Sequence, residues 1–397
     1  MTNGNDSSRS RILFNSVRDR LPEEESFSSP LHTPRTAAVL GLALGIAFTV
    51  CFLTGLLSHL HQHPLTWLPI PSRPAGLYRV TQSLHIATGI AAIPLLLIKL
   101  WVVYPQFWTR PAVRNATHAI ERLSLFPLVA GALFMLFSGV ANVASWYTPM
   151  GFFFTSGHYW GAWITIGGLI IHIGAKISTT RLALSRRAPE LAAVADGVGM
   201  SRRGLLATAA ATGGVLTLAT IGQTVWPLRR LSVLAPRDPA LGPQGHPINK
   251  TFADSGIEAV AVADDAYVLS VEGTVPRPFR LTLAELRAMP QYEATLPIQC
   301  VEGWSYSATW RGVRVRDLLD HAGASGEAEA SVVSLQRNSF YATTSLDRSQ
   351  AHDADTLLAL QLDGEPLAPD HGYPLRLIAP NRPGALQTKW VSKLVVA

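Results

Sequence analysis

The sequence predicts a multi-domain fold: an all-α transmembrane helical bundle of five spans, followed by a separate α+β domain. Two observations predict it. Only 15% of the 397 residues are charged, and the deficit is concentrated in the first 230 residues, whereas an average soluble chain has about 25% charged residues. After Pro227 the composition changes, and short β-type runs alternate with helical ones.

Five runs with little or no charge predict the spans, because each reaches or approaches the roughly 20 apolar residues that cross a bilayer. Buried core helices of a large soluble protein are the alternative interpretation, but five such runs in series are rare there. We expect the first four to form a domain over 36–180, after a disordered cytoplasmic segment, 1–35. The runs are 36–58, 80–98, 123–145, 159–175 and 204–226.

Arginines predict how the spans are oriented. They cluster before the first span, between the second and third, and between the fourth and fifth, whereas 146–157 carries no charge. The positive-inside rule therefore places the N-terminus in the cytoplasm and everything after the fifth span outside the plasma membrane. These clusters account for the net charge of +6, and no nucleic-acid-binding motif accompanies it. The arginines are Arg9, Arg11, Arg18, Arg20, Arg35, Arg110, Arg114, Arg181, Arg186, Arg187, Arg202 and Arg203.

The segment 181–230, which contains the fifth span, has a character of its own. Ser201-Arg202-Arg203-Gly204 precedes a stretch of small residues, 207–214. The pattern resembles a twin-arginine export signal placed inside the chain. Two arginines that anchor an ordinary helix end are the alternative. The export interpretation matters because that pathway carries folded proteins, often with their cofactors inserted.

Histidines in the predicted spans indicate a functional site, because ionisable residues are rare inside membranes. His158 and His172 are fourteen residues apart on the fourth helix. They therefore share one face, about 21 Å apart along the axis. By depth, His85 and His158 form an outer candidate pair for haem iron, and His118 and His172 form an inner pair that matches less well. Histidines at the membrane interface are the alternative, which suits His59, His61, His63 and, among the candidates, His118.

This arrangement resembles the transmembrane b-type cytochromes, in which paired histidines on facing helices of a four-helix bundle ligate haem. The resemblance implies one or two haem b groups in the membrane domain.

The region after the spans reads as a linker, 231–245, and one domain, 246–397. The linker is rich in Pro, Arg and Gly, and the domain has turn signals at 272–273, 363–364 and 382–384. About 150 residues are enough for one core. The expected strands are 267–271, 294–299, 331–335, 374–378 and 389–396, and the expected helices are 283–287 and 315–322.

Cys300 is one of two cysteines, and the other, Cys51, lies in the first apolar run, so no disulfide framework is expected. The thiol therefore either packs or does chemistry. Gln299-Cys300-Val301-Glu302-Gly303-Trp304-Ser305 resembles the molybdenum-binding segment of sulfite-oxidase-fold molybdopterin enzymes, most closely the periplasmic methionine-sulfoxide reductase branch. Asp370-His371-Gly372-Tyr373-Pro374-Leu375-Arg376 and then Lys389-Trp390 follow in the same order as in that fold.

This resemblance, which covers 246–397, implies a molybdopterin cofactor whose molybdenum is ligated by Cys300, the catalytic residue. A thiolate suits a high-valent molybdenum already bound by sulfur. The family's pterin phosphate is held by basic side chains and backbone amides, and arginine suits phosphate especially well. Taken singly, each residue has an ordinary explanation, as a surface cation, a turn residue or a small core residue. The implied contacts to molybdopterin are Asn249, His371, Arg376, Gln387, Thr388 and Lys389.

The chain also departs from the sulfite oxidases. Glu302-Gly303-Trp304 stands where those enzymes carry arginines that bind the sulfite anion, which argues against sulfite as the substrate. Their C-terminal dimerisation domain does not follow, so no obligate dimer is implied.

We therefore expect a membrane-bound oxidoreductase that passes electrons between the quinone pool, b haem and a molybdenum centre on the outer face. Its reaction with a small-molecule substrate would be oxygen-atom transfer, with reduction of an S-oxide or N-oxide favoured. One alternative is a haem-only transmembrane electron-transfer protein whose outer domain is a binding module. Another is a membrane-anchored binding module with neither cofactor.

Overall fold

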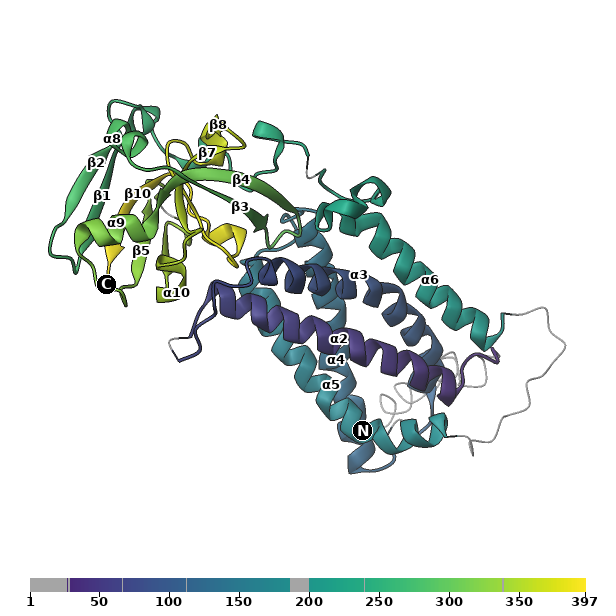
Figure 1. Ribbon diagram of the computed structural model, residues 1–397. Helices are drawn as coiled ribbons and strands as arrows, with labels where there is room; N and C mark the ends of the chain where they lie inside the picture. Colours follow the sequence, from purple (N-terminus) through teal and green to yellow (C-terminus); the bar gives the residue numbers. More distant parts are fainter. Residues whose placement is uncertain are drawn as a thin grey trace, which may run out of the picture. The chain divides into compact units, whose positions relative to one another are not determined.

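The structure, a computed structural model, describes residues 27, 29–65, 67–111, 113–185, 200–238, 240–337 and 339–397 (Figure 1). The chain divides into two compact units. The first comprises Met1–Thr49, Ile90–Phe137 and Trp160–Val215, and the second comprises Val50–Gly89, Ser138–Tyr159 and Leu216–Ala397. Most of the predicted disordered segment 1–35, as well as Arg186 and Arg187, lies outside the described residues.

Five long helices coincide with the five predicted runs. Among the described residues, these five are long and apolar enough to cross a membrane. The last is followed by a short 3-10 helix, η3 (Ile221–Gln223), so the helical segment ends before Trp226. The five are α2 (Pro34–Gln62), α3 (Leu77–Val103), α4 (Ala116–Val143), α5 (Phe154–Leu184) and α6 (Arg202–Thr220).

Glycines let two of these helices approach closely within the first unit. A Cβ at Gly168 of α5 would lie 3.0 Å from the backbone nitrogen of Leu128 of α4. One at Gly131 of α4 would collide with Thr165 of α5. Small residues at such crossings are typical of helix packing in membranes.

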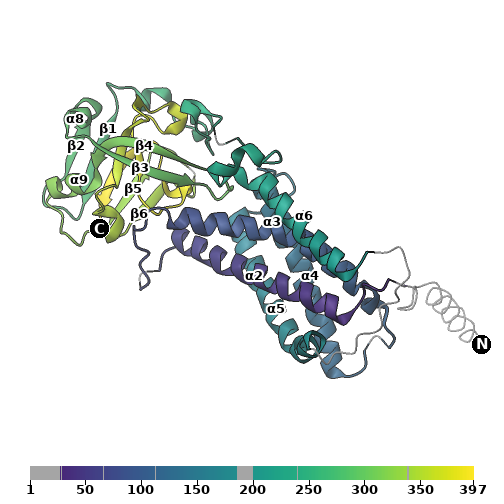
Figure 2. The same ribbon diagram turned by 45° about the vertical axis from the view of Figure 1, so that its right-hand side comes forward.

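The region after the helices contains two five-stranded sheets (Figure 2). The first has the order β2-β1-β10-β5-β6; β1 and β10 are parallel and the other pairs are antiparallel. Its strands are β1 (Val268–Gly273), β2 (Phe279–Thr282), β5 (Ala330–Ser334), β6 (Thr343–Leu346) and β10 (Val391–Val396).

The second sheet has the order β3-β4-β7-β8, and β9 pairs with β7. Its longest element is the antiparallel hairpin of β3 and β4, which runs in register from Tyr292 opposite Gly312 to Gln299 opposite Ser305. The strands are β3 (Tyr292–Gln299), β4 (Ser305–Arg314), β7 (Leu357–Leu362), β8 (Glu365–Pro366) and β9 (Arg376–Ile378).

Short helices complete this region. α8 (Leu283–Ala288) begins with a capping box between Thr282 and Glu285, and α9 (Val315–Ala322) ends at Gly323 in the left-handed conformation. The remaining elements are η2 (Tyr104–Trp108), η4 (Trp226–Leu231), η5 (Pro243–Gly245), α7 (Phe252–Ser255), η6 (Ala259–Val262), α10 (Arg348–Ala351), η7 (Pro369–His371) and η8 (Gly384–Leu386).

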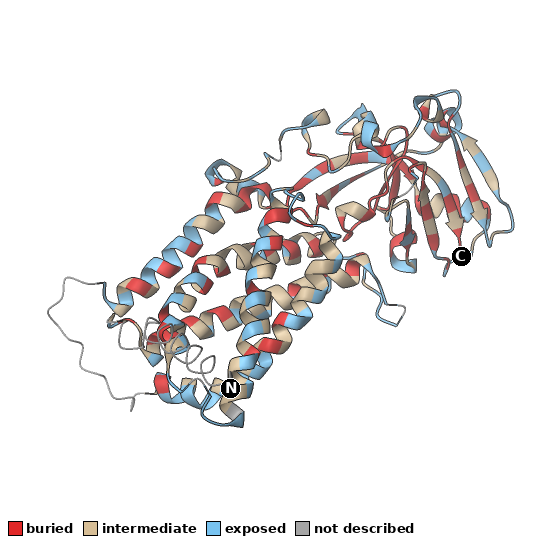
Figure 3. Ribbon diagram, turned by 180° about the vertical axis from the view of Figure 1, so that it is seen from behind, coloured by how far each residue is buried: buried red, intermediate tan, exposed pale blue. Residues whose placement is uncertain are grey.

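Buried residues gather along the strands (Figure 3). One core cluster joins β1, β5 and β10 to α8 and α9 through residues such as Leu269, Leu318 and Leu394. A second cluster lies on the hairpin and β7 and includes Trp310 and Cys300. The second cluster therefore contains the cysteine that the sequence singled out.

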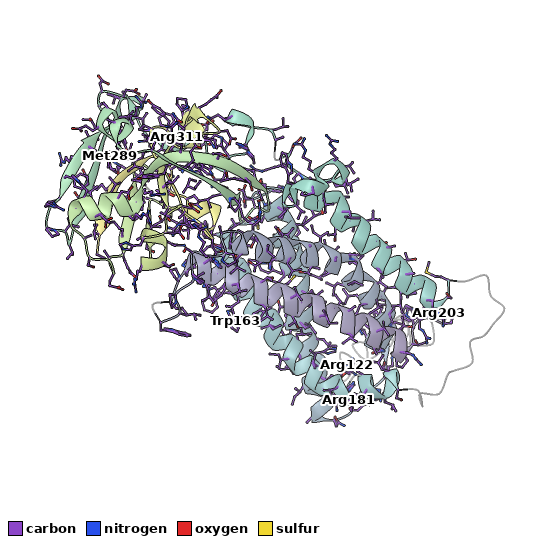
Figure 4. The ribbon with its side chains drawn as sticks, viewed as in Figure 1. Arg122, Trp163, Arg181, Arg203, Met289 and Arg311 are labelled. Carbon is purple, nitrogen blue, oxygen red and sulfur yellow. The ribbon has the colours of Figure 1, made fainter. Side chains whose placement is uncertain are left out.

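The arginines of the first unit follow the pattern expected of alternating spans. Arg122 near the start of α4, Arg181 near the end of α5 and Arg203 at the start of α6 lie at the same end of the helices (Figure 4). Consecutive spans that run in opposite directions require this arrangement. The assignment of that end to the cytoplasm stays a prediction.

Candidate functional site

Cys300 lies at the tip of the β3–β4 hairpin, directly after Gln299. Its N–H donates to the carbonyl of Trp304 at 3.0 Å, and its carbonyl accepts from the N–H of Gly303 at 3.1 Å. Gly303 has a φ of +92°, in the region that favours glycine. The paired strands and this tight turn hold the cysteine rigidly.

The Cys300 thiol is buried, with the residue only 2% exposed, among Trp304 and Tyr306. Burial raises its pKa well above the ordinary range, and the nearby Glu302 carboxylate adds to the effect. A buried thiolate needs a balancing positive charge, which a bound metal ion supplies. Among the described residues no group of three or more His, Cys, Asp or Glu could enclose a metal by itself. A metal at Cys300 therefore needs further ligands from a cofactor.

Groups from distant parts of the sequence surround this sulfur. A charge on Cys300 contributes to the pKa of Tyr147, Tyr306, Tyr341 and Lys389, although burial is the main cause of each shift. Burial raises the pKa of Tyr306 to about 12. Of the four, Tyr306 lies in the same buried cluster as Cys300.

Arg376, on β9, is a buried cation, with 3% of the residue exposed. Its Nη1 donates to the carbonyl of His371 at 3.1 Å, and the guanidinium carbon lies 5.3 Å from the centroid of the Trp310 ring. Its Nε is buried and makes no hydrogen bond to any described residue. Burial lowers its pKa, and the tyrosine Tyr306 opposes that shift in part. A buried cation with an unpaired N–H fits an anionic ligand.

His371 is fully buried beside Arg376. Its Nε2 donates to the carbonyl of Pro243 at 2.7 Å, while its Nδ1 is buried without a partner among the described residues. Burial and the neighbouring Arg376 lower its pKa to about 4. His246 lies next to it, stacked on Tyr306 with ring centroids 4.3 Å apart, and its Nδ1 is likewise buried and unpaired. Three unpaired ring or guanidinium nitrogens therefore gather at one place.

Lys389 completes the basic set. Its Nζ donates to the carbonyls of Lys250 at 2.7 Å and Asp370 at 2.8 Å, and burial lowers its pKa well below the ordinary value. These bonds attach the segment around Asn249 to the site. Asn249 itself is exposed.

Gln387 is bonded within the fold, whereas the role predicted for the backbone N–H of Thr388 stays a prediction. The backbone N–H of Gln387 donates to Gly384 at 3.2 Å, and its side-chain amide makes two 2.8 Å bonds with the backbone of Ala379. The hydroxyl of Thr388 bonds that of Thr344 at 2.7 Å. The bonding groups of Gln387 are therefore used within the fold.

The structure brings His85 and His158 together within the second unit, with ring centroids 6.1 Å apart. Nδ1 of His85 donates to the carbonyl of Cys51 at 2.9 Å, and Nδ1 of His158 bonds Oγ of Ser138 at 2.9 Å. Two imidazoles on opposite sides of one metal, at about 2.0–2.1 Å from it, have centroids roughly 6 Å apart. Metal-bound histidines also commonly use their second nitrogen in such a hydrogen bond. The pair therefore has the separation expected of two histidine ligands of one metal, with Nδ1 of each ring already engaged.

Glycines lie against both rings. A Cβ at Gly55 would come within 3.1 Å of Cε1 of His85, and one at Gly139 would lie 3.7 Å from Cε1 of His158. The absence of side chains there leaves room beside the rings for a flat ligand.

His118 and His172 are not brought together by any contact among the described residues. Nδ1 of His118 accepts from the N–H of Arg114 at 3.2 Å, beside the first turn of α4. Nδ1 of His172 is buried without a partner. The inner haem pair stays a prediction, and the bond to Arg114 agrees with the interfacial interpretation of His118.

The chain is similar to known proteins in its C-terminal part. Residues 257–397 match the family model described as the oxidoreductase molybdopterin binding domain. This region is a molybdopterin-binding oxidoreductase domain. Its relatives include sulfite oxidases and a nitrate reductase, and the matching model describes an enzyme domain. The expectation of a molybdopterin oxidoreductase is confirmed, which disfavours an outer domain that only binds a partner.

Three relatives illustrate the molybdopterin-binding domain's similarities. The uncharacterized oxidoreductase YuiH of Bacillus subtilis is 37% identical over 124 residues, or 31% of this chain and 61% of YuiH. The putative protein-methionine-sulfoxide reductase subunit YedZ1 of Azospira oryzae is 33% identical, covering 38% of this chain and 55% of YedZ1. The sulfite oxidase of Arabidopsis thaliana is 27% identical, and the match covers 33% of this chain and 42% of that sulfite oxidase. The chain thus spans less than two thirds of the length of each.

Sequence reasoning missed His246, Tyr306 and Tyr341 as neighbours of the molybdopterin-binding domain's predicted site. No short motif contains them, since each comes from a different part of the domain. Only the pairing of β3 with β4 and the path of the segment before α7 bring the first two together.

Proposed function

We propose that the chain is a membrane-bound molybdopterin-dependent oxidoreductase that passes electrons between the quinone pool, b haem and an outer-face molybdenum centre. Its reaction would be oxygen-atom transfer, with reduction of an S-oxide or N-oxide favoured. The observation that carries the proposal is the buried thiol of Cys300 in one core cluster with Trp310, because the guanidinium of the buried Arg376 lies over that ring at 5.3 Å.

Each part of that site has a role toward the cofactor. The sulfur of Cys300 would ligate molybdenum, which when bound supplies the two-electron chemistry of oxygen-atom transfer. The unpaired Nε–H of Arg376 and the ammonium of Lys389 would bind the pterin phosphate, and Nδ1 of His371 would donate to it when the anion holds that ring protonated. Asn249, on the segment that Lys389 holds, would contact the pterin from the solvent side.

The histidine geometry supports the haem. His85 and His158 would ligate one b haem through Nε2, since a carbonyl and a hydroxyl occupy their Nδ1 atoms. The five apolar helices would hold this haem in the plasma membrane, with the N-terminus cytoplasmic and the catalytic domain outside. Export through the twin-arginine pathway would then carry the folded domain across. The quinone pool in the surrounding lipid would be the electron partner.

The charge near Cys300 supports the choice of substrate. Glu302 is buried, and its carboxylate lies 3.1 Å from Nη2 of Arg237. That arginine is therefore paired with a carboxylate and not available to an anion. A neutral S-oxide or N-oxide suits such a site better than sulfite does.

Metal analysis and a visible spectrum on one preparation test the proposal. We expect molybdenum and a haem Soret band in the same protein. The variant Cys300→Ser should lose oxygen-atom transfer while it keeps the haem spectrum. Turnover that survives this substitution would rule out Cys300 as the metal ligand, and haem without molybdenum would favour the haem-only alternative.

A further inference from the structure

The turn that follows Cys300 is held by side chains from outside the hairpin. Its three carbonyls each accept a hydrogen bond: Val301 from Nδ2 of Asn142 at 2.8 Å, Glu302 from Nε2 of Gln223 at 3.4 Å, and Gly303 from the hydroxyl of Thr224. The three donors are buried, with 3%, 1% and 3% of the residue exposed. We call Asn142, Gln223 and Thr224 the turn clamp.

The turn clamp comes from the ends of two long helices. Asn142 is in the last turn of α4, whereas Gln223 ends η3 after α6 and Thr224 follows it. These residues and the hairpin all belong to the second unit. Turn carbonyls are normally satisfied by water or local backbone. Here three successive carbonyls depend on two helix ends, so those ends determine where the turn lies.

The Glu302 side chain strengthens this attachment. Its Oε1 lies 3.1 Å from the hydroxyl of Tyr147, in the α4–α5 connection, and Oε2 accepts from Nε1 of Trp304 at 2.9 Å. The hydroxyl of Tyr147 also lies 3.1 Å from Oδ1 of Asn142. The hydroxyl of Tyr147, an exposed residue, therefore links the Glu302 side chain of the turn to Asn142 of α4.

Gly303 shows how closely the turn is packed. A Cβ there would come within 3.0 Å of Cδ1 of Ile86 on α3 and 3.1 Å of Nε2 of Gln223. Its φ of +92° disfavours any other residue, and a Cβ would fit only if the side chains of Ile86 and Gln223 moved by a few tenths of an ångström. The turn therefore packs closely against side chains from the helix ends.

We propose that Asn142, Gln223 and Thr224 are positioning residues for Cys300, and that the ends of α4 and α6 set the position of its sulfur. The inference rests on the proposed function only in treating that sulfur as the metal ligand. The same helix reaches the histidine pair, because Ser138 lies one turn before Asn142 and bonds His158. A movement of α4 would therefore change the positions of both the His158 ring and the turn that holds Cys300.

Hydrogen–deuterium exchange of the full-length purified protein tests the turn clamp. Thr224→Val removes the donated hydroxyl at nearly constant shape, whereas Thr224→Ser keeps it. We expect the backbone amides of the segment 300–305 to exchange about fivefold faster in Thr224→Val, from the loss of one buried hydrogen bond. Asn142→Leu should have a similar effect, and Thr224→Ser should exchange like the unmodified protein.

Thr220→Val is the matched control. Thr220 is on the same helical segment, but its hydroxyl bonds Leu216 of its own helix. Unchanged exchange of 300–305 in both Thr224→Val and Asn142→Leu would overturn the proposal. Equal acceleration in Thr220→Val and Thr224→Val would overturn it as well, since general loosening of α6 would then explain the result.

Molybdenum content and the electron paramagnetic resonance spectrum of the reduced metal, measured on the same samples, separate this inference from the proposed function. A protein without molybdenum refutes the proposed function but leaves the exchange comparison valid. With molybdenum present, we expect an altered metal spectrum in Thr224→Val and a normal one in Thr224→Ser. A normal metal spectrum in Thr224→Val would show that the sulfur position does not depend on the clamp.

Discussion

The imidazole rings of His85 and His158 lie at an interplanar angle of 74° with their centroids 6.1 Å apart, and each ring uses Nδ1 in a hydrogen bond to its own surroundings. Such a pair has both Nε2 atoms left for one metal between them. His85 is on α3 and His158 is on α5. Substitution of these two histidines should therefore have a different effect from substitution of the remaining candidates.

His85→Ala or His158→Ala should abolish the absorption of the outer haem, because an axial ligand of the iron is lost. His118→Ala is the matched control, since its ring nitrogen bonds the backbone of Arg114. We expect its spectrum to match that of the unmodified protein. The measurement is the Soret absorbance per protein after purification. A loss of about half the absorbance in His118→Ala would instead indicate a second haem.

Arg376→Met should reduce cofactor retention, because it removes the guanidinium that lies buried with an unpaired Nε. A hydrogen bond to a charged group contributes about 1.5–3 kcal/mol, which corresponds to a loss of affinity of about tenfold or more. Arg311→Met on the exposed face of β4 is the control. Molybdenum and pterin content of both variants checks the prediction. Equal content would show that Arg376 does not hold the cofactor.

His371 should make the cofactor-free protein sensitive to acid. Its pKa is lowered from 6.5 to about 4 by burial and by Arg376. Between those values the unfolded chain binds more protons than the folded one, so stability is full above pH 6.5 and falls as the pH drops toward 4. The full loss is roughly 3 kcal/mol.

Thermal melting of cofactor-free protein between pH 7 and pH 5, beside His371→Gln, measures this effect. The glutamine variant lacks the titrating group and should show a flatter dependence on pH. A bound phosphate at Nδ1 should also flatten it, because an anion favours the protonated ring. Identical slopes for both proteins would mean that His371 does not titrate as its burial requires.

Parts of the fold that follow from local pattern could be predicted, and parts set by distant contacts could not. The helix at 315–322 coincides with α9, since its apolar residues Leu318 and Leu319 recur at helical spacing. The strand β7 was missed because Leu357–Leu362 consists mainly of leucine and alanine, which favour helices, and only its burial between β4 and β9 makes it a strand.

The candidate site divides in the same way. The motif around Cys300 singled out this cysteine as the candidate metal ligand. Depth along the helices predicted that His85 lies close to His158. The amide of Gln387 was expected at the anion, but Gly384 accepts its N–H. That bond depends on the path of η8, which no local sequence pattern specifies. The same holds for the turn clamp, whose three residues are far from Cys300 in sequence.

Gly303→Ala should displace the turn, whereas Gly364→Ala should not, although both glycines have a positive φ, of +92° and +86°. A left-handed conformation costs a non-glycine residue about 1–2 kcal/mol, and this cost applies to both variants. Only Gly303 faces a neighbour, Cδ1 of Ile86 at 3.0 Å from the added Cβ, since Gly364 has nothing within 4 Å.

We therefore expect a similar small loss of thermal stability in both, with a drop in molybdenum content in Gly303→Ala alone. Metal analysis beside thermal melting measures the two effects separately. If Gly364→Ala lost as much molybdenum as Gly303→Ala, backbone strain and not the contact with α3 would explain the loss.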